Sequence, residues 1–393
     1  MKNKLLLALT TISLTVISLV SCTVAPQSSQ GGSENTSQNS SQTSSTINLY
    51  PDAEIIQGYY SNPLQVTYRN GTPYTIEIAD PTVVRGDDGL FYCFSTDQRA
   101  LVSEDGCTWT VHSDNIIPRP TWGDSYHGGG YKNLWAPDCV KIGDKWIYYY
   151  SLSGWSAPVG VGYAVADSCG GPYVDQGKLF DGDEMGIKNC IDPQVFVDDD
   201  GKVYLTVGSF QGLYLMELED DGMSLRGGVE TQKANKELIA GYNGDWDGAT
   251  YEGGYITKRG DYYYYFGSAG TCCAGKDSTY QVYVGKSADI WGPYVGKDGI
   301  EMTKSRGSKT YGELVVQAPM SQRENYAGVG HNSILIDDVG DYWIYYHGYS
   351  KVDSFRTRHL FMDKLIWDEQ GYPSVEKKRP SFEEEKAGPI FLV

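Results

Sequence analysis

The 393-residue chain has few basic residues for its size. It contains 32 Lys and Arg against 50 Asp and Glu, which gives a formal net charge of −18 at pH 7. A protein that binds nucleic acid needs a basic face, because contacts to phosphates supply most of the affinity. No basic stretch of that kind occurs in the sequence. The charge balance therefore excludes nucleic acid as a partner and favours a neutral one.

Cysteine spacings typical of a metal site are also missing. No Cys-x-x-Cys pair occurs, so the sequence gives no sign of a zinc centre. Beyond Cys22 there are seven cysteines, an odd number, and several lie in predicted strands where Cys acts as a small apolar filler. Adjacent Cys272 and Cys273 can shape a loop, and we assign them no chemistry. A disulfide pattern does not follow from these positions.

Long apolar runs are absent apart from one at the N-terminus. Lys2 and Lys4 precede an apolar stretch from Leu5 to Val20, which is too short for a spanning helix and is typical of a secretion signal. Cys22 at its end resembles a bacterial lipobox, so we expect a lipid anchor there rather than an ordinary secretion signal. The anchor would place the protein in the cell envelope, at the outer membrane or cell surface.

The chain after the signal divides into a linker and one large domain. Residues 23–47 are almost all small or polar and cannot bury a core, which predicts a flexible linker. Residues 48–393 contain no second linker and few periodic Leu or Ala runs, so we expect a single all-β domain. We also expect a monomer.

Aromatic residues are abundant, and many of them follow a short motif that recurs along the chain. The chain has 32 Tyr. Five times an Asp-Gly or Gly-Asp pair precedes a run of aromatic and β-branched residues, which is a hairpin signal because both residues tolerate the backbone of a tight turn. The pairs occupy positions 88–89, 143–144, 200–201, 260–261 and 340–341. Five such units predict a five-bladed β-propeller.

Each unit opens with a polar residue on its innermost strand. These residues recur at intervals of 54 to 79 positions and are Asp80, Asp138, Asp192, Glu252 and His331. Innermost strands converge on the propeller axis, so their first residues line one shared depression. Taken singly, an Asp beside Pro is more often a turn residue. Repetition at equivalent positions favours a site, although Asp138 follows its Pro and is interpreted as structural.

Three carboxylates in one depression are suited to cleaving glycosidic bonds. Asp80, Asp192 and Glu252 come from separate blades and can meet at the axis. Such hydrolysis uses a protonated carboxyl as acid and an ionised one as base, and a third carboxylate keeps the acid protonated. Aromatic side chains fit the same substrates, because sugar rings stack on them. Chain position alone does not assign the roles.

The motifs together resemble those of glycoside hydrolase family 43, and among them the arabinan-cleaving enzymes. The similarity spans residues 76–376, and its motifs are Ala79-Asp80-Pro81, Trp135-Ala136-Pro137-Asp138, Asp192-Pro193-Gln194, Tyr251-Glu252-Gly253-Gly254, the segment 271–280 and Gly330-His331-Asn332-Ser333. The resemblance implies an inverting mechanism with Asp80 as base, Glu252 as acid and Asp192 tuning the acid. It also implies that His331, with waters, holds a calcium ion on the axis.

Two departures and two alternatives accompany this resemblance. Ala79 stands where arabinanases often have His, and Glu252 is followed by Gly-Gly instead of the commoner Ala-Pro or Gly-Pro.

For substrate binding we expect Trp135, Ser209 and Phe210 to contribute. The expected substrate is α-1,5-linked arabinan. The alternatives are an exo-acting arabinofuranosidase or xylosidase, favoured if loop 121–131 or 241–247 blocks the cleft, and a glycan-binding lipoprotein without activity.

Overall fold

The computed structural model describes residues 53–125, 133–152, 160–244, 248 and 250–393. The predicted signal with Cys22 and the linker 23–47 lie outside these residues and stay predictions. Loops 121–131 and 241–247 are described only in part. In the described ranges no helix is both long and apolar enough to span a membrane.

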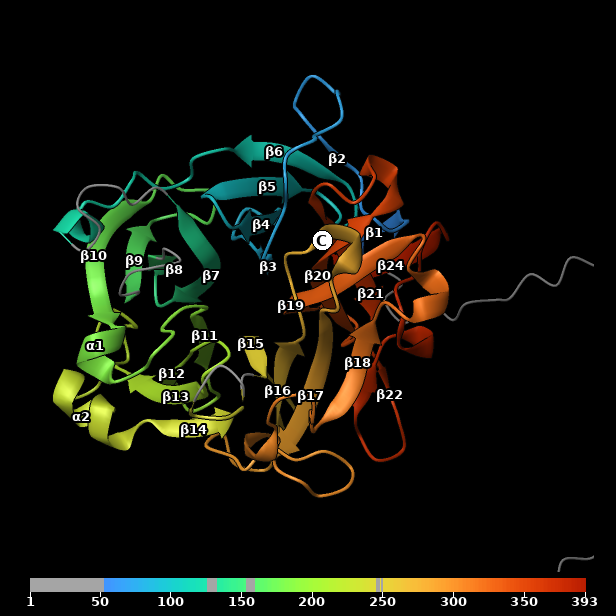
Figure 1. The fold of residues 1–393 in the computed structure, drawn as a ribbon. Helices are drawn as coiled ribbons and strands as arrows, with labels where there is room; N and C mark the ends of the chain where they lie inside the picture. The colour runs from blue at the N-terminus through green and yellow to red at the C-terminus, as the bar shows by residue number, and fades with distance from the viewer. Residues whose placement is uncertain (1–52, 126–132, 153–159, 245–247, 249) are drawn as a thin grey trace, which may run out of the picture. The chain divides into compact units, whose positions relative to one another are not determined.

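Five antiparallel sheets surround one axis, which confirms the five-bladed propeller (Figure 1). The first sheet consists of β3 (Thr82–Arg85), β4 (Phe91–Ser95), β5 (Arg99–Ser103) and β6 (Trp109–Ser113). The second consists of β7 (Leu134–Ile142), β8 (Lys145–Leu152), β9 (Gly160–Ala166) and β10 (Val174–Asp181). The third consists of β11 (Gln194–Val197), β12 (Val203–Val207), β13 (Leu213–Leu218) and β14 (Glu237–Ala240).

The last two blades complete the circle. The fourth consists of β15 (Tyr251–Arg259), β16 (Tyr262–Ala269), β17 (Gln281–Ser287) and β18 (Glu313–Gln317). The fifth contains β19 (Tyr326–Ile336), β20 (Tyr342–Ser350) and β21 (Arg358–Lys364). In every blade the first strand is the one nearest the axis (Figure 1).

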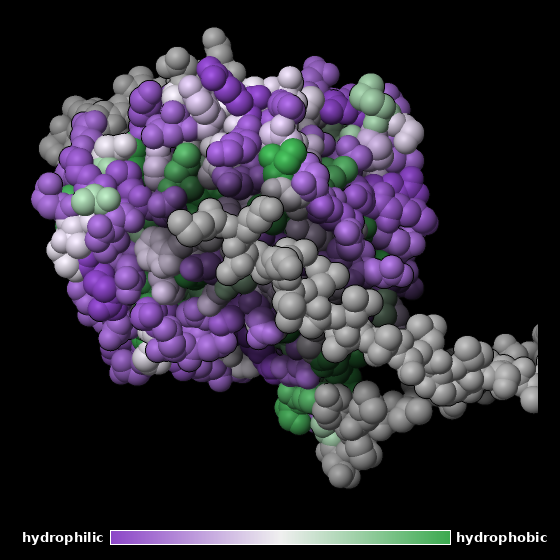
Figure 2. Space-filling model, turned by 90° about the horizontal axis from the view of Figure 1, so that it is seen from below, coloured by the Kyte–Doolittle hydropathy of each residue, from purple (hydrophilic) through white to green (hydrophobic). Residues whose placement is uncertain are grey.

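Short elements decorate the blades. β2 (Val66–Thr67) runs parallel to β6, β1 (Ile55–Tyr60) pairs with β24 (Lys386–Leu392), and β22 (Ile366–Trp367) pairs with β23 (Pro373–Ser374). The helices α1 (Gly182–Met185) and α2 (Val229–Asn235) lie at the rim of the second and third blades (Figure 1). Hydrophilic residues cover most of the side shown in Figure 2.

The glycines of the five predicted hairpins adopt the conformation that the turn requires. Each has a positive φ, between 58° and 83°, and they are Gly89, Gly143, Gly201, Gly260 and Gly340. The hairpins therefore form where the Asp-Gly and Gly-Asp pairs predict them.

Tyrosine is abundant because its ring fills the core between blades while its hydroxyl finds a polar partner. The buried Tyr149 donates to the Gly222 carbonyl of the third blade at 2.7 Å. Tyr345 of the fifth blade likewise donates to the Gly106 carbonyl of the first blade at 3.0 Å. These two bonds each join one blade to its neighbour.

A ring of side-chain hydrogen bonds also links the innermost strands. Ser333 accepts from the Val83 N–H, Thr82 donates to Asp138, Asp138 accepts from the Val195 N–H, Gln194 accepts from the Ile256 N–H, and Tyr255 donates to the Ile334 carbonyl. The ring passes through all five blades in order. It fixes the spacing of the strand starts around the axis.

Candidate active site

A cavity of about 340 Å³ opens at the starts of the innermost strands, and the substrate-pocket residues expected from the sequence meet in it. These are Asp80, Trp135, Asp192, Ser209, Phe210, Glu252 and His331. Residues from all five blades therefore contribute to one depression, as the spacing of the motifs predicts.

In each blade a left-handed residue lies within the innermost strand or two residues before it. Three of the five have a φ of 51–61° and a polar side chain that lines the cavity: Asp80, Asp192 and His331. Such a conformation is uncommon outside glycine and persists only where the surroundings hold it. A side chain of the preceding blade does so: His347 accepts from Asp80 N–H, Ser151 from Asp192 N–H, and Ser268 from His331 N–H.

The equivalence of the five opening residues expected from the sequence is wrong in two blades. In the second blade the left-handed position belongs to Ala136, with φ of 40°, and in the fourth to Gly253, with φ of 59°. Asp138 stands two residues further on and Glu252 one residue earlier. Asp138 is buried within the ring of interblade bonds, in agreement with its structural interpretation. Glu252, like Trp135 in the second blade, lies one residue before the left-handed residue of its blade. Both side chains line the cavity.

Asp80 is surrounded by groups that favour its ionised form. Thr96 donates to its Oδ2 at 2.6 Å, and its Oδ1 lies 3.6 Å from Arg358 Nη1. Burial alone would raise the pKa of Asp80, but His331, Arg358 and His347 together hold it well below its ordinary value. Burial also lowers the pKa of His331 to about 4, so Arg358 supplies the positive charge near neutral pH.

Glu252 and Asp192 form a buried pair with the opposite tendency. Burial, and then the negative charge of Asp80, raise the pKa of Glu252 to about 7. Burial and the charges of Glu252 and Asp80 raise the pKa of Asp192 well above its ordinary value. Ser209 donates to Glu252 Oε2 at 3.0 Å, and the Gly253 N–H donates to Asp192 Oδ2 at 3.0 Å. The pair therefore retains a proton near neutral pH while Asp80 is ionised.

Sequence reasoning missed the residues that support Asp80. Arg358 forms a fork with Glu77, with Nε–Oε1 at 2.9 Å and Nη2–Oε2 at 3.1 Å, and this geometry aims the guanidinium at the cavity. His347 comes from the middle of an aromatic strand and Thr96 follows β4. Arg358 begins a segment, residues 358–367, that resembles a closing strand of the wider family, and this resemblance is the signal in the sequence that could have found it.

The residues around His331 do not form a calcium cage by themselves. Calcium binds six to eight oxygen ligands, yet in the part of the chain that the structure describes no three His, Cys, Asp or Glu side chains are placed to share a metal ion. His331 Nδ1 lies 3.2 Å from Asp80 Oδ1. The amide of the adjacent Asn332 is buried without a hydrogen-bond partner among the described residues, but it does not line the cavity that His331 lines. An ion beside His331 would therefore need water for its remaining ligands.

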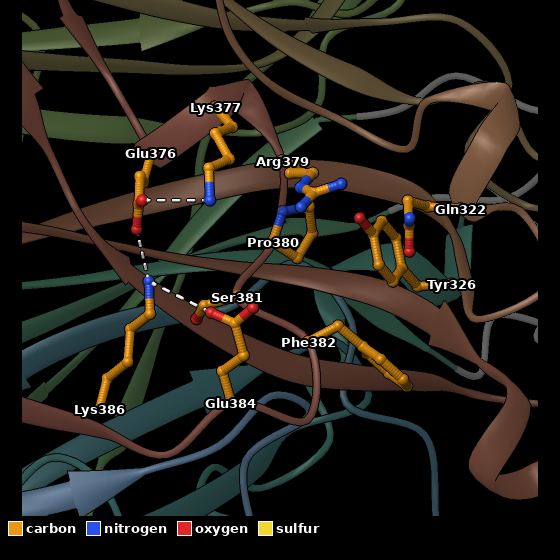
Figure 3. A pocket seen from close by; sticks show the side chains of 10 residues that line it. All are labelled: Gln322, Tyr326, Glu376, Lys377, Arg379, Pro380, Ser381, Phe382, Glu384 and Lys386. Carbon is orange, nitrogen blue, oxygen red and sulfur yellow. Dashed lines mark hydrogen bonds and ion pairs between the residues drawn. The ribbon is translucent and has the colours of Figure 1, made fainter.

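A second, smaller cavity near the C-terminus has a different character (Figure 3). Four of its five charged side chains pair with one another: Lys386 with Glu376 at 2.8 Å and with Glu384 at 3.8 Å, and Lys377 with Glu376 at 3.4 Å. It shares no residue with the cavity of the three carboxylates. The carboxylate cavity is therefore the candidate active site.

Comparison with known proteins agrees with this geometry. Residues 68–373 match the family model described as glycosyl hydrolases family 43. An extracellular exo-α-(1→5)-L-arabinofuranosidase of Cellvibrio japonicus is 30% identical over 319 residues, covering 77% of this chain and 87% of that protein. An extracellular endo-α-(1→5)-L-arabinanase of Bacillus subtilis is 29% identical over 305 residues, covering 75% and 86%.

The fold comparison gives the same family. A solved structure of Cellvibrio cellulosa α-L-arabinanase complexed with arabinohexaose superimposes with a TM-score of 0.67 and 28% identity, covering 78% of this chain and 97% of that one. The family match extends over most of the described domain and includes all three carboxylates. The chain belongs to glycosyl hydrolase family 43 and is a glycosidase.

Proposed function

We propose that the protein hydrolyses α-1,5-linked L-arabinan by a single displacement. The observation that carries this proposal is the contrast between Asp80, held ionised, and the Glu252–Asp192 pair, which retains a proton. One base and one acid with separated pKa values are what glycosidic hydrolysis requires. The relatives that act on arabinan support the choice of substrate.

Each residue then has a distinct task. Asp80 accepts a proton from the attacking water, and Arg358 keeps its carboxylate ionised. Glu252 donates its proton to the leaving oxygen. Ser209 donates to Glu252 Oε2 and so holds the carboxyl in place. Asp192, fixed by Ser151 and the Gly253 N–H, maintains the pKa of Glu252 and orients the sugar.

The site of cutting separates the main proposal from its alternative. We propose internal cutting, with terminal cutting by an arabinofuranosidase or xylosidase activity as the second candidate, favoured by the 30% identity to the exo-acting relative. Linear arabinan should yield a ladder of oligosaccharides within the first few per cent of hydrolysis. Product sizing over time checks this, since a single short product from the start would favour terminal cutting.

A metal ion at His331, if present, is expected to act on the site indirectly. We propose that calcium, or another cation, is held by His331 through water, where it would stabilise the propeller centre. Chelation should lower activity only in part, because water-mediated contacts are weak, and added calcium should restore it. Unchanged activity and Tm after exhaustive chelation, with no metal co-purifying, would contradict this role.

We also propose that the protein is exported and anchored at Cys22, with residues 23–47 as a tether. The sequence at positions 1–22 supports this location, and relatives are named extracellular enzymes. Cell fractionation checks it, because a lipid-anchored protein would be recovered with membranes and not in the soluble fraction.

A further inference from the structure

A disulfide between the adjacent residues Cys272 and Cys273 lies between the active-site cavity and a larger neighbouring one. The neighbouring cavity has a volume of about 560 Å³. Phe210, Cys272 and Cys273 line both cavities. Cys273 is exposed and its Sγ lies 3.9 Å from Arg358 Nη1. The disulfide and the Phe210 ring therefore form the boundary across which the two cavities meet.

The loop that carries the disulfide is held by its own hydrogen bonds. The Thr271 N–H donates to Thr279 Oγ1 and the Thr279 N–H donates to the Thr271 carbonyl, both at 3.0 Å. The buried Ser278 hydroxyl accepts from the Ala274 N–H at 2.9 Å and donates to the Cys272 carbonyl at 3.3 Å. The two sulfur atoms are thus presented at a fixed place beside the active site.

Phe210, the other residue of this boundary, is also held in place. Its φ of 57° is uncommon for a bulky residue. The backbone is held there by bonds from Phe210 N–H to the Tyr251 carbonyl at 2.5 Å and from Thr250 N–H to the Phe210 carbonyl at 3.4 Å. An aromatic ring offers a flat surface to the apolar face of a sugar, and the sulfur atoms of a disulfide offer a polarisable apolar contact beside it.

The remaining wall of the neighbouring cavity is polar but uncharged. It presents the hydroxyl or amide groups of Thr271, Thr279, Gln281, Ser308 and Thr310, and its lining includes no Asp, Glu, Lys, Arg or His. The active-site cavity, in contrast, is lined by several charged groups. Apolar surfaces combined with neutral hydrogen-bonding groups suit a neutral carbohydrate.

The position of this cavity indicates which part of the substrate it would take. Two of its residues, Thr250 and Ala269, flank the strand pair that carries Glu252, where Tyr251 faces Ala269 and Glu252 faces Ser268. The acid protonates the oxygen that leaves, so the leaving part of the chain lies on the side of Glu252.

We propose that the cavity bounded by Phe210 and the Cys272–Cys273 disulfide binds sugar units on the leaving-group side of the arabinan chain. This inference rests on the proposed function. The disulfide is a wall of the substrate cleft and a determinant of affinity for long chains. It takes no part in the chemical step.

A substitution that fills the neighbouring cavity, and changes no residue of the active-site cavity, tests this inference. Ser308→Trp places a large ring in the neighbouring cavity, and Lys309→Trp places the same ring at the next position of that loop, outside the lining. On linear arabinan, Ser308→Trp should raise KM by about tenfold with kcat within about twofold, because uniform binding is lost while the chemistry is kept. Lys309→Trp should match the wild type in both constants.

A second variant examines the disulfide itself. The double change Cys272→Ser and Cys273→Ser should raise KM in the same way, with folding checked by Tm. An unchanged KM in Ser308→Trp, with the wild type active on arabinan, would overturn the inference while leaving the proposed function intact. A wild type that does not cleave arabinan would overturn both.

Discussion

Asp80→Asn and Glu252→Gln are each expected to lower kcat on linear arabinan by about a hundredfold or more, since general acid and base groups contribute on that order. Both side chains line the same cavity, and each substitution keeps the side-chain shape while removing the ability to ionise. The two variants should differ in pH dependence. In the wild type, kcat/KM should fall as the pH rises through about 7, because Glu252 loses its proton there. This fall is the descending limb of the plot of kcat/KM against pH, and Glu252→Gln should lack it.

Asp261→Asn is a matched control for these variants. Asp261 is exposed, lies at the hairpin turn of the blade that carries Glu252, and is remote from the cavity lining. It should retain wild-type kcat and KM. Activity close to that of the wild type in Asp80→Asn or Glu252→Gln, with Tm unchanged, would remove that residue from the mechanism.

Asp192→Asn is expected to have a comparable effect on turnover, about a hundredfold or more, through a different cause. The amide can still accept from the Gly253 N–H, so the local backbone should survive. Asp192 and Glu252 are coupled, however, so the negative charge left when the first proton leaves the pair holds the second proton more tightly. With Asp192 replaced by Asn, Glu252 titrates alone, so the descending limb of kcat/KM should move to lower pH.

The pH profile separates this role from a merely structural one. A variant that only loosened the pocket would lose rate at every pH and keep the limb near pH 7. A limb that does not move in Asp192→Asn would therefore contradict the assignment of Asp192 as the residue that tunes Glu252.

The propeller and its cavity could be predicted because they depend on short-range signals. Gly89 and Gly201 mark hairpins through the positive φ that their turns require. Asp80 and Asp192 precede Pro, which marks the blade openings but predicts extended backbone for the residue before it. That expectation is wrong, because both residues are left-handed, with φ of 54° and 61°.

Features that depend on distant contacts could not be predicted in this way. Glu252 lies one residue before the left-handed position, because a register shift between Glu252 and Tyr255 displaces the strand start. Arg358 reaches Asp80 only when the fifth blade closes against the first. His347 looks like one more residue of an aromatic strand until the Asp80 N–H is seen to donate to it.

The anomeric configuration of the first product tests the central claim most directly. If Asp80 activates a water and Glu252 protonates the leaving oxygen, the two carboxyl groups should be about 6.5–9.5 Å apart and the product must have the inverted configuration. Proton NMR during the first minutes of hydrolysis of linear arabinan should therefore show the β-anomer of the new reducing end before mutarotation. Initial release of the α-anomer would mean that a carboxylate attacks the sugar, and it would contradict the roles given to Asp80 and Glu252.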